Sequence, residues 1–546
     1  MKRLRFPAIL LALATLFSVP PVRAYDSLTY LYGSSTSVYL SRMAKTCDSV
    51  NIVSPDYFET TASGAVIFTK TPDPLLISMM HTNGVTVTPF VSNHWNRAQG
   101  RAMLKNPSAA VTFLVNAVKT YGLDGLDIDI QNINHDDRAD FTAFIAMLRN
   151  ALPTGKTLTV CVAANPYRTN VGWQGGYDYG ALAQYCDHVF MMTYDESYEG
   201  SSAGPVCSMW FIEESVKYGL EHVPKEKLML GIPFYGRYWA RSTNKKDGFA
   251  WTIADIEWLI AATNATVTYD EQKACARATI VVPQGSNLKT WGGSSISPDT
   301  YDVWFDNAQS FEQKLALVRK YDIKGVGTWA LGQEPSYMWE NFSAWLNGLP
   351  FNDIKNHWAQ SYIINLAAEN LITGRTATTF APDGTLTRAE AATLLCRIAN
   401  LAPQNGTAAF TDTGSHWANG YIAAAKSAEL ISGFSNGTFL PDAPVTREQF
   451  AVMAERYTSM SDAVNLIDSP FSDVSKSLNP WSNDAILILA ASGVLSGYND
   501  GTFRPHNTIT RGETAKLVTV LRTLPTRFVD GQILPSDDDA PHMEPR

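Results

Sequence analysis

The stretch Asp124-Gly125-Leu126-Asp127-Ile128-Asp129-Ile130-Gln131 decides how the first part of this chain folds. Side chains alternate across a β-strand, so the polar residues of the stretch share one face and its apolar residues share the other. Because the apolar face must pack against helices, we expect Asp127, Asp129 and Gln131 to point into the centre of a closed sheet. Carboxyl groups buried there are costly unless they share protons or bind a ligand. A polar network that only stabilises the fold is the alternative, although such barrel interiors are usually filled by Val, Ile and Leu.

The sequence on both sides of this stretch alternates in the manner of strand–helix units. Short β-branched apolar runs are followed by amphipathic segments such as 137–152, where apolar residues recur at helical spacing. We therefore predict an α/β fold, a (β/α)8 TIM barrel over residues 25–348, with a small α+β insertion at 240–301 between its seventh and eighth strands. The predicted strands are Leu28–Tyr32, Val50–Val53, Val85–Val91, Leu126–Gln131, Leu158–Ala164, His188–Tyr194, Leu228–Pro233 and Gly325–Ala330.

A second pattern occurs three times after the barrel. Each copy has a Phe-x-Asp start, a tryptophan, a turn that ends in Phe-x-Pro, and a Thr-Arg pair. Each is predicted to form a helix, a turn and a second helix capped by the threonine, which gives an all-α repeat domain. The predicted copies cover residues 349–405, 406–466 and 467–525, and an acidic, Pro-containing tail at 526–546 is predicted to be disordered.

The composition and charge of the chain limit its possible partners, its location and its cofactors. The formal charge of -9, without a run of Lys and Arg, argues against nucleic acid as a partner. Residues 1–24 combine basic residues, a short apolar stretch and a small-residue ending, so we predict a removed signal peptide and not a membrane anchor. No later stretch is apolar for long enough to be a transmembrane segment. The six cysteines lack the spacing of a disulfide framework or zinc site, so we expect mostly buried thiols, with no metal and no cofactor.

The quoted stretch resembles the signature of glycoside hydrolase family 18, Asp-Gly-x-Asp-x-Asp-x-Glu on the fourth barrel strand. Every position matches except the last. Further similarity lies at Met192–Asp195, Gly231–Arg237 and Gly325–Trp329. Ser54–Phe58 and Tyr194–Ser197 look more like the N-acetylglucosaminidase branch that acts on bacterial peptidoglycan and spore cortex than like secreted chitinases.

The resemblance implies a retaining, substrate-assisted glycosidase in which the acetamido oxygen of the sugar attacks its own anomeric carbon. By position, Asp129 would hold the acetamido N–H, Asp127 would share a proton with Asp129, and Tyr194 would donate to the acetamido oxygen. Trp329 would form the apolar floor under the sugar ring. The other substrate contacts implied are Asp195, Arg237 and Glu196.

Gln131 stands where the family has its catalytic glutamic acid. An amide can hydrogen-bond the glycosidic oxygen, but it has no acidic proton near neutral pH. Three interpretations remain open at this point. The barrel binds glycan without turnover, Glu196 or Glu199 acts as a surrogate acid, or glutamine replaces the acid of an active parent sequence.

The repeats resemble S-layer homology domains in all three copies. The resemblance implies a three-pronged helical unit that binds secondary cell-wall polysaccharide, often pyruvylated, in grooves between copies. A guanidinium fork would suit a carboxylate, and tryptophans could stack on a sugar ring. The alternative is that the aspartates cap helices and the tryptophans belong to the core. The copies also diverge, with Glu448, Gly512 and Gln449 departing from the Thr-Arg-Ala-Glu motif. The expected polymer contacts are Asp353, Trp358, Arg388, Asp412, Trp417, Arg447, Asp473, Trp481 and Arg511.

Together these patterns predict a secreted protein held non-covalently on the cell wall or S-layer of a Gram-positive-type envelope. Its barrel is expected to act on or bind GlcNAc-containing glycan, either peptidoglycan or chitin-like oligomers. A purely structural S-layer protein is a further alternative, but it leaves the buried Asp127 and Asp129 unexplained.

Overall fold

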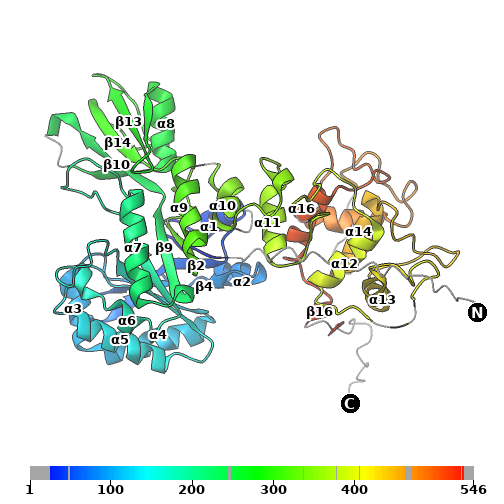
Figure 1. The fold of residues 1–546 in the computed structure, drawn as a ribbon, viewed down its shortest axis with the longest axis horizontal. Helices are drawn as coiled ribbons and strands as arrows, with labels where there is room; N and C mark the ends of the chain where they lie inside the picture. The colour runs from blue at the N-terminus through cyan, green and yellow to red at the C-terminus, as the bar shows by residue number, and fades with distance from the viewer. Residues whose placement is uncertain are drawn as a thin grey trace, which may run out of the picture.

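The chain folds into two lobes, the barrel with its insertion on one side and the helical repeats on the other (Figure 1). The computed structural model describes residues 25–46, 49–243, 247–335, 337–376, 378–404, 406, 408–460, 469–529 and 532–533. The predicted signal peptide at 1–24 lies outside the described residues. Within this part of the chain, none of the helices has both the length and the apolar character that a bilayer-spanning segment requires.

Eight parallel strand positions close the predicted barrel, with β1 pairing both β15 and β2. The third position is divided in two around Pro89, because proline has no N–H for the strand ladder. Strand β3 (Val66–Phe68) adds to β2 in antiparallel orientation. The barrel strands are β1 (Asp26–Leu31), β2 (Ile52–Thr60), β4 (Thr86–Val87) with β5 (Phe90–Ser92), β6 (Gly125–Asp129), β7 (Thr157–Ala163), β8 (His188–Met192), β9 (Leu228–Pro233) and β15 (Gly325–Trp329).

Helices surround this sheet and bury their apolar faces against it. In α5 (Arg138–Ala151), Phe141, Phe144, Ile145 and Leu148 are fully buried, in the same core as the apolar residues of β6. This arrangement confirms that the apolar face of the fourth strand meets the helices. The other barrel helices are α1 (Thr36–Met43), α2 (Pro74–Thr82), α3 (Arg97–Lys105), α4 (Pro107–Tyr121), α6 (Tyr179–Leu182), α7 (Met209–His222), α9 (Ala308–Tyr321) and α10 (Met338–Asn347).

The insertion is a five-stranded antiparallel sheet with one helix, and it is wider than the predicted range of 240–301. It begins at Tyr235, directly after β9, and ends at Phe305. Tyr235 and Arg237 therefore belong to the insertion and not to the barrel wall. Its elements are β10 (Tyr235–Ala240), β11 (Phe249–Thr252), α8 (Ile253–Thr263), β12 (Val267–Asp270), β13 (Cys275–Val282) and β14 (Asp299–Phe305).

The repeat domain is helical, as predicted, and the second helix of each copy begins with a capping box made by the threonine of the Thr-Arg pair. The ordered domain extends beyond residue 525, where the disordered tail was predicted to begin, because Phe528 is buried and stacks on Tyr457. Residues 534–546 of that tail lie outside the described part. The elements are α11 (Gln360–Ala368), α12 (Arg388–Ile398), α13 (Asn419–Ser427), α14 (Arg447–Glu455), α15 (Asn483–Ala491), α16 (Arg511–Leu521), β16 (Phe528–Val529) and β17 (Gln532–Ile533).

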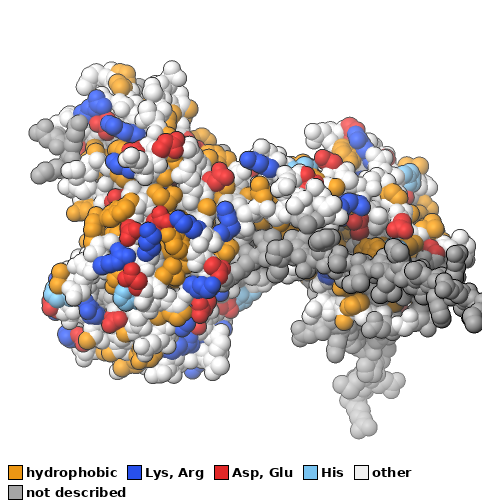
Figure 2. All heavy atoms as spheres, in the orientation of Figure 1, with side chains coloured by type: hydrophobic (Ala, Val, Ile, Leu, Met, Phe, Trp, Pro, Cys, Tyr) orange, Lys and Arg blue, Asp and Glu red, His pale blue; other side chains and the backbone are white. Residues whose placement is uncertain are grey.

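Two predictions from composition can be compared with the fold. The five cysteines within the described residues are buried free thiols, as expected, while Cys47 lies outside those residues. On the face drawn in Figure 2, Lys and Arg side chains of the described residues are interspersed with Asp and Glu. Hydrophobic side chains gather on the barrel lobe below the insertion.

Candidate functional sites

The centre of the barrel holds the two carboxyl groups of β6. Asp127 is fully buried, and it accepts hydrogen bonds from Ser54 Oγ at 3.1 Å and from Cys161 Sγ at 3.3 Å. Burial raises the pKa of Asp127 to about 6, against the effect of these donors. Burial also raises the pKa of Asp129 to about 7, and the nearby charge of Asp127 adds to that rise. The two groups are therefore placed to share protons near neutral pH.

Gln131 follows the strand and turns back onto Asp129. Its Nε2 donates to both carboxylate oxygens of Asp129, at 2.7 and 2.8 Å. Its backbone N–H donates to Asn93 Oδ1 at 2.8 Å, and Asn93 Nδ2 donates back to the Gln131 carbonyl at 2.8 Å. Asn93 therefore fixes the backbone of Gln131, while the side-chain amide donates to the Asp129 carboxylate.

A cavity of 410 Å³ opens at the C-terminal ends of the strands, above these residues. It brings together most of the residues predicted for the barrel site: Asp129, Gln131, Tyr194, Asp195, Arg237 and Trp329. Asp127 lies beneath them, next to Tyr30 and Cys161. The cavity is also lined by Tyr30, Cys161, Met192, Tyr235, Ala250, Trp251, Thr252 and Gln333.

One wall of the cavity is polar and its floor is aromatic. Arg237 donates from Nε and Nη2 to Asp195 Oδ1, at 3.0 and 2.7 Å, and the Tyr235 hydroxyl donates to the same oxygen at 2.7 Å. Trp329 packs against Tyr30, with ring centroids 5.1 Å apart. Such a combination suits a sugar, whose hydroxyls need hydrogen-bond partners and whose C–H faces pack on aromatic rings.

The two glutamates considered as contacts or surrogate acids do not reach this cavity. Glu196 accepts hydrogen bonds from the backbone N–H of Ser208 at 2.6 Å and from its hydroxyl at 3.0 Å, at the start of α7. Glu199 is exposed and is not part of the lining.

The other lining residues were not predicted as site residues from the sequence, and three of them are aromatic: Tyr30, Tyr235 and Trp251. The position of Tyr30 near the end of the first strand could have identified it, because barrel sites are built at strand C-terminal ends. Trp251 lies on the insertion and stacks on Tyr238, with centroids 3.8 Å apart. It reaches the cavity only through packing between distant segments.

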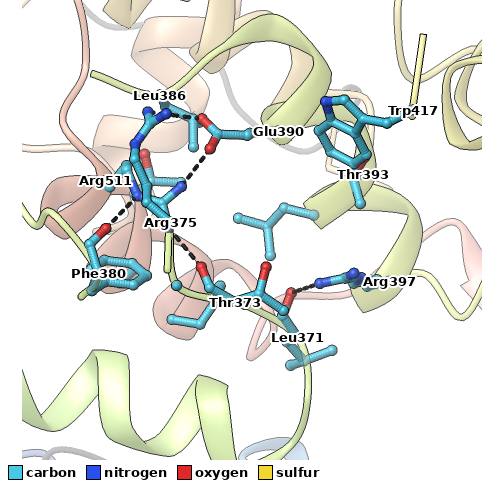
Figure 3. A pocket seen from close by; sticks show the side chains of 15 residues that line it. Leu371, Thr373, Arg375, Phe380, Leu386, Glu390, Thr393, Arg397, Trp417 and Arg511 are labelled. Carbon is cyan, nitrogen blue, oxygen red and sulfur yellow. Dashed lines mark hydrogen bonds and ion pairs between the residues drawn. The ribbon is translucent and has the colours of Figure 1, made fainter. Parts of the chain in front are cut away.

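The arginine of each Thr-Arg pair is buried and joins two repeats, which differs from the expected open fork. Arg388 donates from Nε to the Phe439 carbonyl at 2.8 Å and from Nη2 to the Ser432 carbonyl at 3.1 Å. The equivalent bonds run from Arg447 to Phe503 and Ser496, and from Arg511 to Phe380 and Thr373. The third copy thus bonds back to the first, as Figure 3 shows for Arg511 beside Phe380 and Thr373, and the repeats close into a ring.

The structure also shows what the predicted aspartates and tryptophans of the repeats contact. The aspartates are Asp353, Asp412 and Asp473. Each aspartate accepts two backbone N–H groups of the turn before the second helix, so it holds that turn and does not cap a helix. The tryptophans are exposed, by 56% for Trp358, 64% for Trp417 and 57% for Trp481. They are therefore not core residues and are accessible to a ligand.

The first lobe is thus a closed parallel barrel with two buried carboxyls, an amide and aromatic residues at its mouth. Residues 78–334 match glycosyl hydrolases family 18, and residues 350–392, 409–451 and 470–515 match the S-layer homology domain. The chain therefore carries a family 18 domain followed by three S-layer homology domains.

Known proteins similar to this chain include both enzymes and solved structures. YdhD of Bacillus subtilis (strain 168), whose name describes a sporulation-specific glycosylase, is 28% identical over 250 residues, covering 45% of this chain and 56% of that protein. The cortical fragment-lytic enzyme of Bacillus anthracis is 22% identical over 341 residues, 59% of this chain and 75% of that protein. A chitinase structure from Chromobacterium violaceum ATCC 12472 has a TM-score of 0.51 at 28% identity, covering 59% of this chain and 98% of that one. The chain thus spans little more than half the length of the first of these relatives.

Proposed function

We propose that this chain is a secreted glycan-binding protein held non-covalently on a Gram-positive-type cell wall by its S-layer homology domains. Its family 18 barrel binds GlcNAc-containing glycan without appreciable hydrolysis. The observation that carries this proposal is Gln131, which occupies the position of the general acid and directs its amide onto Asp129. An amide is too weak an acid to transfer a proton to a glycosidic oxygen.

The rest of the cavity supports recognition of an N-acetylated sugar. In the proposed complex, Asp129 accepts the acetamido N–H, Tyr194 donates to the acetamido oxygen, and Trp329 packs under the ring, and the fact that all three line one cavity supports these roles. Removal of a general acid costs on the order of a hundredfold to ten-thousandfold in rate, while ground-state binding can survive. Peptidoglycan is the preferred ligand class and chitin-like oligomers the alternative, in keeping with the sporulation and cortex functions in the names of the relatives.

Binding to a defined oligosaccharide tests this proposal. We expect the full chain to bind labelled N-acetylchitotetraose and soluble peptidoglycan fragments in calorimetric titrations, with no release of reducing ends. Trp329→Ala should weaken binding about tenfold, because the apolar floor is lost. Trp291→Ala is the matched control, since Trp291 is 74% exposed and does not line the cavity. Equal affinity of the Trp329→Ala variant and the parent would contradict the assignment.

A further inference from the structure

A buried polar cluster lies where the insertion joins the barrel, and none of its residues lines the glycan cavity. Its members are Cys207 before α7, Cys275 at the start of β13, Asp306 after β14, and Lys314 on α9. The four residues are at most 3% exposed. Figure 1 shows the strands of the insertion above α7 and α9, so the cluster connects the insertion to two barrel helices.

The ammonium group of Lys314 connects the members of this cluster. Its Nζ donates to the Cys207 carbonyl at 2.6 Å and to the carboxylate of Asp306. The same nitrogen lies 3.5 Å from Cys207 Sγ and 3.4 Å from Cys275 Sγ. Because one ammonium group contacts both sulfurs, the two thiols are close neighbours. The positive charge beside them disfavours a metal cation at this place.

The backbone segments that carry the two cysteines are bonded to each other. The N–H of Met209 donates to the Lys273 carbonyl at 2.9 Å, and each of these residues lies two positions from a cysteine. Cys275 Sγ also lies 3.4 Å from the carbonyl oxygen of Cys207. A disulfide needs such a close approach, since its Cα atoms are usually about 4.4 to 6.8 Å apart. Cys207 Sγ now donates to Asp306 at 3.2 Å, and rotation of that side chain is the movement that would bring the sulfurs together.

We propose that Cys207 and Cys275 form a disulfide in the exported protein and thereby fix the insertion to the barrel. The inference rests on the proposed secretion, because disulfides form and persist outside the reducing cytoplasm. The two thiols lose two protons and two electrons to an external disulfide such as oxidised glutathione, which leaves as two thiols. Lys314 and Asp306 keep their ion pair, so no buried charge is left alone.

The burial of the cluster determines when this bond forms. Burial raises the pKa of both thiols, that of Cys275 to about 12, and the thiolate is the form that reacts in disulfide exchange. Cys275 is further packed against Trp239 and Trp304. The bond is therefore expected to form during folding, before the cluster closes, and to be shielded from reductants in the folded protein.

The disulfide would stabilise one wall of the glycan cavity. The insertion supplies Arg237 and Trp251 to that wall. The two cysteines are 68 residues apart in the sequence, and a bond that closes a long loop removes much conformational freedom from the unfolded chain. The bond thus holds the insertion in the position that completes the cavity.

Peptide mapping after oxidative refolding tests the pairing. The full chain is reduced and unfolded, refolded in a glutathione redox buffer, and then unfolded again with iodoacetamide and without reductant. We expect the peptides of Cys207 and Cys275 to be linked, and those of Cys161, Cys186 and Cys396 to be alkylated. Alkylation of both Cys207 and Cys275 in the refolded chain would overturn the inference. A link from either cysteine to Lys314 through one oxygen atom, recognised by its mass, would also overturn it.

Thermal unfolding tests whether the bond fixes the insertion. We expect the barrel transition of the parent to lie about 5 °C lower when the chain is refolded with reductant, and that of Cys275→Ser to be insensitive to reductant. Cys186→Ser is the matched control, because Cys186 is another buried thiol of the barrel, and its transition should still respond to reductant. A parent transition that is insensitive to reductant would overturn the stabilising role. Retention of the chain inside the producing cells would instead refute secretion, without affecting the result of refolding.

Discussion

The pair formed by Asp129 and Gln131 determines the chemistry of the barrel site at the scale of single residues. Burial raises the pKa of Asp129 to about 7, and the amide of Gln131 opposes that rise by donating to the carboxylate. A glutamic acid at position 131 could share a proton with Asp129 and pass one to a leaving group. Glutamine can only stabilise the ionised Asp129. The substitution therefore keeps the hydrogen bond and removes the acid.

The raised pKa of Asp129 predicts a pH dependence of stability. Asp129 keeps its proton to a higher pH in the folded state than in the unfolded chain, so the free energy of unfolding of the barrel falls as the pH rises from about 4 to about 7. Asp129→Asn removes this contribution. We expect the stability of the variant relative to the parent to increase as the pH rises from about 4 to about 7, measured by urea unfolding of the barrel transition. A difference between the two proteins that does not change with pH would contradict the assigned pKa.

At the scale of secondary-structure elements, three buried arginines hold the ring of repeats together. Each bonds to carbonyl oxygens of the next copy, and each second helix starts at a threonine capping box next to that arginine. Loss of such an arginine leaves carbonyl groups without a donor inside the domain. Under the proposed attachment, the motif arginines therefore affect wall binding first through the fold.

Arg447→Ala tests this structural role. Arg447 bonds to the carbonyls of Phe503 and Ser496 and pairs with Glu513 at 3.2 Å. We expect the variant to lose about 3 kcal/mol of unfolding free energy in the repeat domain, measured by chemical denaturation. Arg504→Ala is the control, because Arg504 is 43% exposed and pairs only within its own turn, and its unfolding midpoint should not change. An unchanged midpoint for Arg447→Ala would exclude the ring-closing role.

A comparison of the predicted and observed elements shows that features set by local sequence could be predicted and features set by contacts between distant segments could not. The barrel strands and the Thr caps depend on local patterns, and the structure confirms them, with strand ends within two residues of the prediction except that β2 continues to Thr60, well past its predicted end at Val53. The alternation along β6 likewise predicted that Asp127 and Asp129 face inward. The role of Arg388 could not be predicted in this way, because its partners Ser432 and Phe439 lie in another repeat. The start of the insertion at Tyr235 was missed because one strand follows another without a turn signal.

At the scale of the whole molecule, a contact between helices joins the two lobes. Helix α10 of the barrel packs on α11 of the first repeat, and α11 packs on α16 of the third. Ser361 Oγ donates to the Glu340 carbonyl at 2.7 Å across the junction, and Ser343 bonds to Asn365. The first repeat therefore contacts both the barrel lobe and the closing copy of the ring. Under the proposed function, this junction links the glycan cavity to the surface that holds the wall.

The central claim is that the barrel keeps a sugar site but lacks its acid, and the most direct test is the release of reducing ends by the full chain and its Gln131→Glu variant. Both are compared on peptidoglycan and on labelled N-acetylchitooligosaccharides, with Gln131→Glu combined with Asp129→Asn as the inactive control. We predict no turnover above buffer for the parent and a gain of at least about a hundredfold for Gln131→Glu. Brisk and equal turnover by the parent and the Gln131→Glu variant would contradict the account.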